Sequence, residues 1–149
     1  MPDSLAARAL ALLARREHSR AELRRKLAAY AESAEQLEQL LDELEQQRRL
    51  SDVRYAENRV SIRGRRYGNA RLDREMRQVG VAPETIASAL AAAGDEVGRC
   101  RAVWQKKFGL LPDTPAEQAK QQRFLQYRGF SQDSIRRVLQ AQNEEGEHE

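Results

Sequence analysis

The stretch RLDREMRQVGV, residues 71–81, carries an apolar pattern that occurs three times in this chain of 149 residues. Its Met76 lies 49 residues after Leu27 and 49 residues before Leu125 (76 − 27 and 125 − 76). The same offset joins Leu37, Ile86 and Ile135, and also Leu41, Leu90 and Leu139. A repeat of about this length is typical of stacked helical units, which bury their apolar faces partly against their neighbours.

Residues that start and stop helices divide the chain clearly. Ser19, Ser33 and Thr114 are each followed three residues later by Glu or Gln, which is the pattern of an N-terminal capping box. Gly80 and Gly129 stand where helices are expected to end, because glycine adopts the left-handed conformation at little cost. These patterns predict no strands and nine helices, at about 4–16, 19–30, 34–48, 52–66, 69–79, 83–93, 95–108, 115–128 and 132–142.

Grouped in threes, the helices predict an all-α fold of three tandem, degenerate three-helix repeats that form an elongated, curved array. The repeats are expected at about 4–50, 51–93 and 94–142, followed by a disordered acidic tail at about 143–149. The second and third repeats share a glycine and an apolar residue, Gly80-Val81 and Gly129-Phe130. The first repeat has Ala31-Glu32 at this place, so its turn is expected to differ.

Composition excludes several classes of protein. No apolar stretch is long enough to span a bilayer, and the N-terminal residues lack the apolar segment of a secretory signal. One cysteine, Cys100, forms no internal disulfide, so we expect a soluble, cytoplasmic protein. The sequence has no glycine-rich phosphate loop, and two histidines with one cysteine are too few for a convincing metal site. We therefore expect no enzyme activity, no metal and no cofactor.

Charge alternates in blocks along the chain. Residues 31–47 contain six acidic residues and no base, whereas residues 48–77 contain ten arginines and four acidic residues. Arginines in this density, with Tyr67 among them, suit contact with phosphates and bases or with the carboxylates of a protein partner. Solvated helix faces are the alternative for each block, and Arg63 could equally tie one helix to the next. The residues chosen as contact candidates are Arg63, Arg65, Arg66, Arg71, Arg74, Arg123 and Arg128.

Three motifs occur in order along the chain. They are Arg16-Glu17-His18-Ser19 with Glu22-Leu23 and Lys26-Leu27; Leu50-Ser51-Asp52-Val53-Arg54-Tyr55-Ala56 with Arg63, Gly68 and Arg71-Leu72; and Arg123-Phe124-Leu125 with Arg128-Gly129-Phe130-Ser131 and Ile135. In this order, and in a chain of this size, they resemble the RecX family, bacterial regulatory proteins that modulate the RecA recombinase. The resemblance extends from about Leu5 to Gln142, and the missing glycine near Ala31 departs from it.

The resemblance implies a non-enzymatic regulator with tandem three-helix repeats, and we expect a monomer. Members of the family bind the filament of RecA on single-stranded DNA in its helical groove, and so inhibit strand exchange, ATP hydrolysis and the coprotease activity that triggers the SOS response. The seven candidate arginines would then contact the filament or its DNA. Two alternatives stay open from the residues alone: a helix-turn-helix-like protein that binds duplex DNA, and a helical scaffold that binds another protein.

Overall fold

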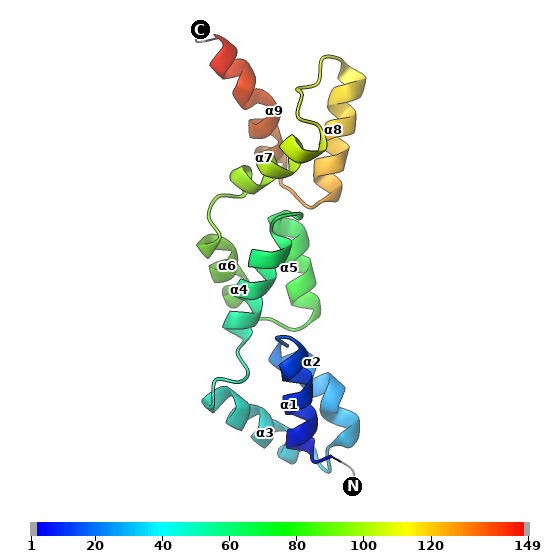
Figure 1. Cartoon of the computed structure of the whole chain (residues 1–149), viewed down its shortest axis with the longest axis vertical. Helices are drawn as coiled ribbons and strands as arrows, with labels where there is room; N and C mark the ends of the chain where they lie inside the picture. The colour runs from blue at the N-terminus through cyan, green and yellow to red at the C-terminus, as the bar shows by residue number, and fades with distance from the viewer. Residues whose placement is uncertain (1–2, 148–149) are drawn as a thin grey trace. The chain divides into compact units, whose positions relative to one another are not determined.

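The computed structural model describes residues 3–147, and the side chains of residues 3–140. Within these residues the chain is all-helical (Figure 1). The α-helices are α1 (Leu5–Arg15), α2 (Arg20–Leu27), α3 (Ala34–Gln46), α4 (Asp52–Arg63), α5 (Asn69–Gln78), α6 (Pro83–Ala92), α7 (Glu96–Lys107), α8 (Pro115–Tyr127) and α9 (Gln132–Glu147), with a short 3-10 helix, η1 (Ala28–Tyr30), after α2. The prediction of tandem three-helix repeats is confirmed.

Side-chain caps set the helix starts that the sequence predicted. The hydroxyl groups of Ser19, Ser33 and Thr114 accept hydrogen bonds from the backbone N–H three residues later, at 3.0–3.1 Å. The predicted second helix ends in the 3-10 turn η1 instead of continuing as α-helix. The last helix extends to Glu147, beyond the predicted end at about 142, and residues 148–149 of the predicted tail lie outside the described residues.

The chain forms two compact units whose division falls within α4, α5 and α6. The first unit contains the described residues through Asn58 together with Met76–Ala89. The second unit contains Arg59–Glu75 and the described residues from Leu90 onward. The middle three-helix repeat therefore contributes to both units, so the compact units do not coincide with the repeats.

Each unit has its own apolar core. In the first unit the buried residues are Ala9, Leu23, Leu27, Leu37, Leu41, Leu44 and Leu50. In the second unit they are Val97, Cys100, Trp104, Leu125, Phe130, Ile135, Val138 and Leu139. The three residues that first revealed the repeat, Leu27, Met76 and Leu125, are all buried, whereas Leu90 is only half-buried.

One break in the apolar pattern has a specific structural reason. The position that holds Leu23 and Leu72 in the first two repeats holds Gln121 in the third, and this glutamine is buried. Its side-chain oxygen accepts a hydrogen bond of 2.8 Å from the indole N–H of Trp104, and its amide donates to the carbonyl oxygen of Leu110 at 3.0 Å. A buried indole N–H needs an acceptor, which an aliphatic side chain at this position would not provide.

The glycine of the second repeat lies against the start of α2 in the first unit. The hydroxyl of Ser19 donates to the carbonyl oxygen of Val79 at 2.5 Å. A Cβ at Gly80 would overlap the Cβ of Ala21, and the φ angle of Gly80 is +80°. The carboxylate of Asp52 accepts from the backbone N–H of Arg20, the first residue of α2, at 2.7 Å.

The second unit repeats this arrangement 49 residues further along the chain (68 − 19 and 129 − 80). The backbone N–H of Gly68 donates to the carbonyl oxygen of Arg128 at 2.8 Å. A Cβ at Gly129 would overlap the Cβ of Arg71, and the φ angle of Gly129 is +92°. Glu96, the first residue of α7, accepts from the backbone N–H of Asn69, the first residue of α5, at 2.7 Å.

The turn of the first repeat has no glycine near Ala31. In the later repeats the glycine lets the turn approach the start of the preceding repeat's second helix closely. Ala31 instead has an extended backbone, with φ −80° and ψ 143°, which suits any residue.

Two buried carboxylates, one in each unit, contact other segments of their own unit. The directions of their pKa shifts predict how stability depends on pH. Burial would raise the pKa of Glu96, but hydrogen bonds from Ser134, Asn69 and Ser131 lower it below its ordinary value. In Glu22 likewise, burial would raise the pKa, but the hydrogen bond and charge of Arg16, with the charges of His18 and Lys26, lower it. A carboxylate whose pKa is lower in the folded state stabilises the fold at every pH above its pKa in the unfolded chain, here 4.5. That stabilisation is lost as the pH falls through the pKa of the folded state.

We therefore expect the melting temperature to fall as pH is lowered from about 6 to about 3. Thermal denaturation followed by circular dichroism measures this directly. The variant Glu96→Gln lacks one of the titrating groups, so it should melt at a lower temperature at neutral pH and show a shallower dependence on pH. A melting temperature that is constant over this range would contradict the assignment.

Candidate functional site

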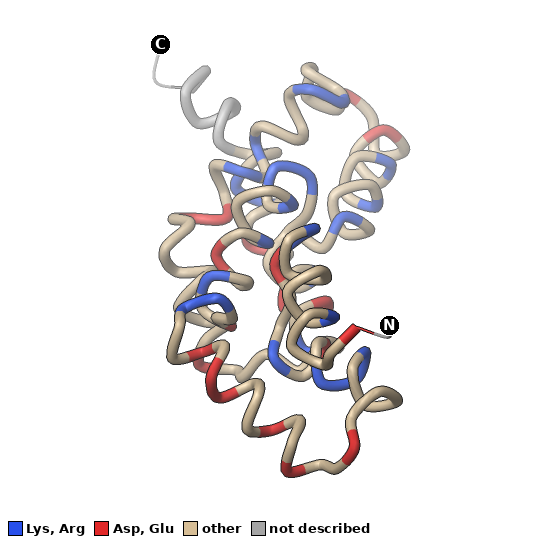
Figure 2. Tube along the Cα trace, turned by 60° about the horizontal axis from the view of Figure 1, so that its bottom comes forward, with Lys and Arg blue, Asp and Glu red and all other residues tan. Residues whose placement is uncertain are grey.

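Salt bridges between α2 and α3 pair positive and negative side chains in the first unit. The guanidinium of Arg20 forms salt bridges of 2.8–3.0 Å with Glu38, Asp42 and Glu45, and Arg24 contacts Glu38 at 2.5 Å. Hydrogen bonds from Arg24 and Arg20 lower the pKa of Glu38 to about 2. Three acidic residues of the block at residues 31–47 (red in Figure 2), Glu38, Asp42 and Glu45, thus hold α3 against α2.

The second unit has fewer carboxylates for its arginines. Arg63 donates two hydrogen bonds to Glu75, at 2.6 and 2.8 Å, while the Nε atoms of Arg59 and Arg71 lie 3.9 and 3.6 Å from the same carboxylate. Burial would raise the pKa of Glu75, but the hydrogen bonds and charge of Arg63, with the charges of Arg59 and Arg71, lower it. One carboxylate therefore serves three guanidinium groups, and the cluster keeps a net positive charge.

Tyr67 lies among these arginines instead of facing solvent. Its ring centroid is 4.1 Å from the guanidinium carbon of Arg71, 4.5 Å from that of Arg63 and 5.4 Å from that of Arg128. Arg99 holds the backbone of this turn by donating to the carbonyl oxygens of Gly64 and Tyr67, at 3.3 and 3.0 Å. Cations of its own chain therefore lie against the ring of Tyr67.

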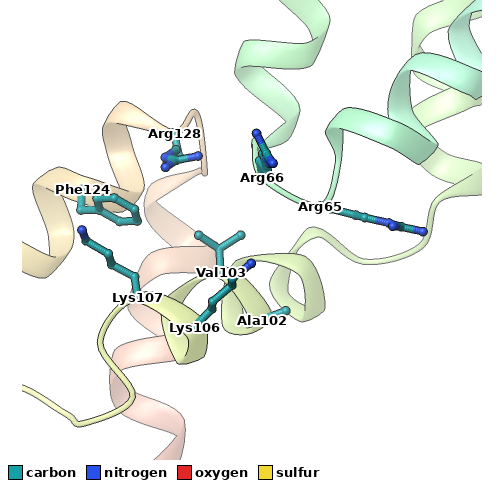
Figure 3. Close-up of a pocket in the computed structure, with 8 residues that line it drawn as sticks. All are labelled: Arg65, Arg66, Ala102, Val103, Lys106, Lys107, Phe124 and Arg128. Atoms are coloured by element: carbon teal, nitrogen blue, oxygen red, sulfur yellow. The ribbon is translucent and has the colours of Figure 1, made fainter.

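A pocket of about 490 Å³ lies next to this cluster in the second unit. Three segments line it: the turn after α4, one face of α7 and the end of α8. We call it the basic pocket, and its residues are Arg65, Arg66, Ala102, Val103, Lys106, Lys107, Phe124 and Arg128. The four residues from α7 are two adjacent pairs, 102–103 and 106–107, separated by four positions, which places them on one side of the helix. In Figure 3, Val103 and Phe124 lie between the cationic side chains, and Arg65 extends away from them.

The basic pocket has no negative charge of its own. None of its lining residues is a carboxylate. Among the described side chains, residues 3–140, none of its five cations forms a salt bridge. Phe124 is held by Phe108, edge to face at 5.4 Å between centroids, with Lys107 and Arg128 at 5.3 and 5.0 Å from its ring. An apolar floor surrounded by unpaired cations suits an anion that carries a flat apolar part.

The seven candidate arginines fall into three groups. Arg65, Arg66 and Arg128 line the basic pocket. Arg63 and Arg71 belong to the cluster around Glu75 and Tyr67. Arg74 on α5 and Arg123 on α8 are exposed and line no pocket described for this chain.

Sequence reasoning missed half of the basic pocket. Lys106 and Lys107 are not among the candidates, which rest on the local density of arginine; both lie in the last turn of α7, where cations favour the helix dipole. Phe124 was noticed only as part of a motif. The adjacent pair of lysines, in a chain whose bases are mostly arginine, was the one feature that could have pointed to α7.

The described residues show no arrangement suited to metal or thiol chemistry. No group of three or more His, Cys, Asp or Glu residues among them could hold a metal ion. Burial raises the pKa of Cys100 to about 12, so its thiol is a poor nucleophile at neutral pH. In the same part of the chain, no helix is both long enough and apolar enough to cross a membrane.

Comparisons with known proteins agree with one another. Residues 51–90 match the family model of the second three-helix domain of RecX, and residues 95–139 match that of the third. Regulatory protein RecX of Ralstonia nicotianae is 48% identical over 140 residues, covering 93% of this chain and 88% of that protein. Regulatory protein RecX of Chromobacterium violaceum is 48% identical over 136 residues, covering 91% and 89%.

The fold agrees with a solved structure as well. The crystal structure of RecX from Lactobacillus salivarius superimposes with a TM-score of 0.80, covering 92% of this chain and 93% of that one, at 19% sequence identity. At that identity the structure supports the fold, while the bacterial relatives at higher identity establish the family. The chain belongs to the RecX family of regulatory proteins.

Proposed function

We propose that this protein binds the filament of the RecA recombinase on single-stranded DNA and inhibits its activities. Binding in the helical groove of the filament would restrain strand exchange, ATP hydrolysis and coprotease activity, and so modulate recombination and the SOS response. In this proposal the protein acts as a cytoplasmic monomer without enzyme activity. Membership of a family of regulatory proteins supports the proposal.

The observation that carries the proposal is the uneven pairing of charge. Arg20 and Arg24 of the first unit pair with carboxylates of α3, whereas none of the five cations of the basic pocket forms a salt bridge with a described side chain. Unpaired cations on a concave surface attract a polyanion and accelerate its association. A filament that contains DNA presents such a charge, and contacts with its phosphates weaken as salt is added.

Tandem repeats suit a helical filament for a further reason. A filament offers the same surface on each protomer, so modules joined in one chain can engage adjacent protomers at once. The second contact is then intramolecular, and weak individual contacts give a high overall affinity. We propose that the basic pocket provides one of these contacts, together with the exposed Arg74 and Arg123.

The test is the ATPase activity of the cognate RecA on single-stranded DNA, measured while this protein is titrated. We expect inhibition at fewer than one molecule per RecA protomer, because a bound regulator that bridges protomers affects more than one of them. A heat-denatured sample serves as the control. An ATPase rate that is unchanged at an excess of the folded protein would contradict the proposal.

The same titration separates the alternatives. A helix-turn-helix-like protein would leave the RecA ATPase unchanged and bind duplex DNA by itself. In this alternative Arg71 on α5 would contact DNA bases in a groove of the duplex. The structure gives it little support, since Arg71 is engaged with Glu75 and Tyr67. A scaffold for an unrelated protein would show neither effect.

A further inference from the structure

The number of cations in the basic pocket is large for its size. A pocket of about 490 Å³ has room for about one nucleotide, within the range of small-molecule sites. Five cationic side chains line it, and four of them lie around its apolar floor in Figure 3. A single nucleic-acid strand brings one phosphate charge per nucleotide, with a rise of roughly 3.4 Å per residue in a helical strand. One nucleotide of a strand would leave most of these cations unpaired.

A compact polyphosphate matches the charge better. A terminal phosphate carries a charge of about −1.5 to −2 at neutral pH, so a triphosphate carries roughly −4 in all. Arginine forks and lysine ammonium groups are the usual protein partners of such oxygens. The lining residues include Arg66 from the turn after α4, Lys106 from α7 and Arg128 from the end of α8, so three separate segments can each supply a donor.

The apolar floor adds a second requirement for the ligand. Val103 is half-buried, and Phe124 is fixed edge to face against Phe108. An inorganic anion would leave this floor exposed to water, whereas a nucleobase has a flat face that stacks on an aromatic ring. The ligand that satisfies both requirements has clustered phosphates attached to a base.

We propose that the basic pocket binds a free nucleoside triphosphate, with its phosphates among the cations and its base against Phe124 and Val103. A bound Mg²⁺ would neutralise part of the phosphate charge that the five cations meet, so the pocket binds the metal-free triphosphate in preference to its magnesium complex. If the same pocket contacts the filament, which rests on the proposed function, then the nucleotide and the filament compete for it. The binding of the nucleotide itself requires no RecA.

The experiment is isothermal titration of the full chain with ATP at low salt, without RecA or DNA. We expect saturable binding, displaced by tripolyphosphate and weakened by excess Mg²⁺. The monophosphate, AMP, should bind at least about tenfold more weakly, since charge-assisted hydrogen bonds are lost with each phosphate. The double variant Lys106→Gln/Lys107→Gln should also lose about tenfold or more in affinity for ATP.

The chain contains a matched control for this variant. Arg136 and Arg137 are also adjacent, exposed cations of the second unit, and they lie on α9 outside the basic pocket. The double variant Arg136→Gln/Arg137→Gln changes the net charge by the same amount and should bind ATP as the parent does. Circular dichroism establishes that both variants are folded.

Three results would overturn the proposal. They are no saturable binding of ATP, equal losses in the two double variants, and binding of a short oligothymidylate that ATP does not displace. Because RecA is absent from this assay, a failure here leaves the ATPase result unaffected. Failure of the proposed function would appear only in the RecA titration.

Discussion

Gly68→Ala is expected to destabilise the protein by about 3 kcal/mol, the upper end of what overpacking usually costs. A Cβ at this position would overlap the carbonyl group of Gly129 and the backbone nitrogen of Phe130. These are backbone atoms, so no side-chain rotation relieves the overlap. The hydrogen bond of 2.8 Å from the Gly68 N–H to the Arg128 carbonyl would be lost or distorted as the two segments separate. Chemical denaturation with urea, followed by circular dichroism, measures the change.

Another glycine of the second unit provides the control. Gly98 lies within α7, and a Cβ there would meet no atom within 4 Å. Gly98→Ala should therefore stabilise the protein by roughly 1 kcal/mol, because alanine loses less backbone entropy in a helix. Equal stabilities of the two variants would show that the close approach of Gly68 to the following repeat is not what holds the second unit together.

The helices were predictable because their determinants are local. Ser19, Ser33 and Thr114 cap helices through hydrogen bonds within four residues, and Gly80 and Gly129 end helices through their own φ angles. The apolar spacing that relates Leu27, Met76 and Leu125 is likewise visible in one dimension. These features require no knowledge of which helix packs against which.

The pairing of charge was not predictable, because it depends on contacts between distant segments. Arg20 of α2 pairs with Glu38, Asp42 and Glu45 of α3, so three of the six acidic residues at 31–47 are engaged in salt bridges. In the sequence Gln121 breaks the apolar pattern; in the structure its side-chain oxygen accepts the hydrogen bond of the Trp104 indole N–H. The two-unit division through the middle repeat also has no marker in the sequence.

Only the parts of the candidate site with a local signal in the sequence were predictable. Local density of arginine identified the turn that contains Arg65 and Arg66, and a motif identified Arg128. Folding adds α7 as the third wall of the basic pocket, with Lys106 and Lys107 about 40 residues from that turn. It also shows that Arg63 and Arg71 are bound to Glu75, so the more exposed cations of the pocket are the better candidates for contact.

Reversal of the two lysines, Lys106→Glu/Lys107→Glu, is expected to weaken the interaction with the RecA filament by at least about tenfold. The change removes two positive charges from the pocket and adds two negative ones, which would repel phosphates and carboxylates alike. Both side chains are exposed and form no salt bridge with a described side chain, so the chain should still fold, with a small loss of stability because the lysines favour the dipole of α7. The matched variant Arg136→Glu/Arg137→Glu makes the same change in net charge on α9, outside the basic pocket.

The most direct test of the account is therefore one comparison on the cognate RecA filament. The quantity to measure is the concentration of protein that halves the ATPase rate of RecA on single-stranded DNA, for the parent chain and for the two reversed variants. We predict that this concentration rises at least about tenfold for Lys106→Glu/Lys107→Glu and changes little for Arg136→Glu/Arg137→Glu. Equal shifts in both variants, or none in either, would contradict the assignment of the basic pocket as a filament contact.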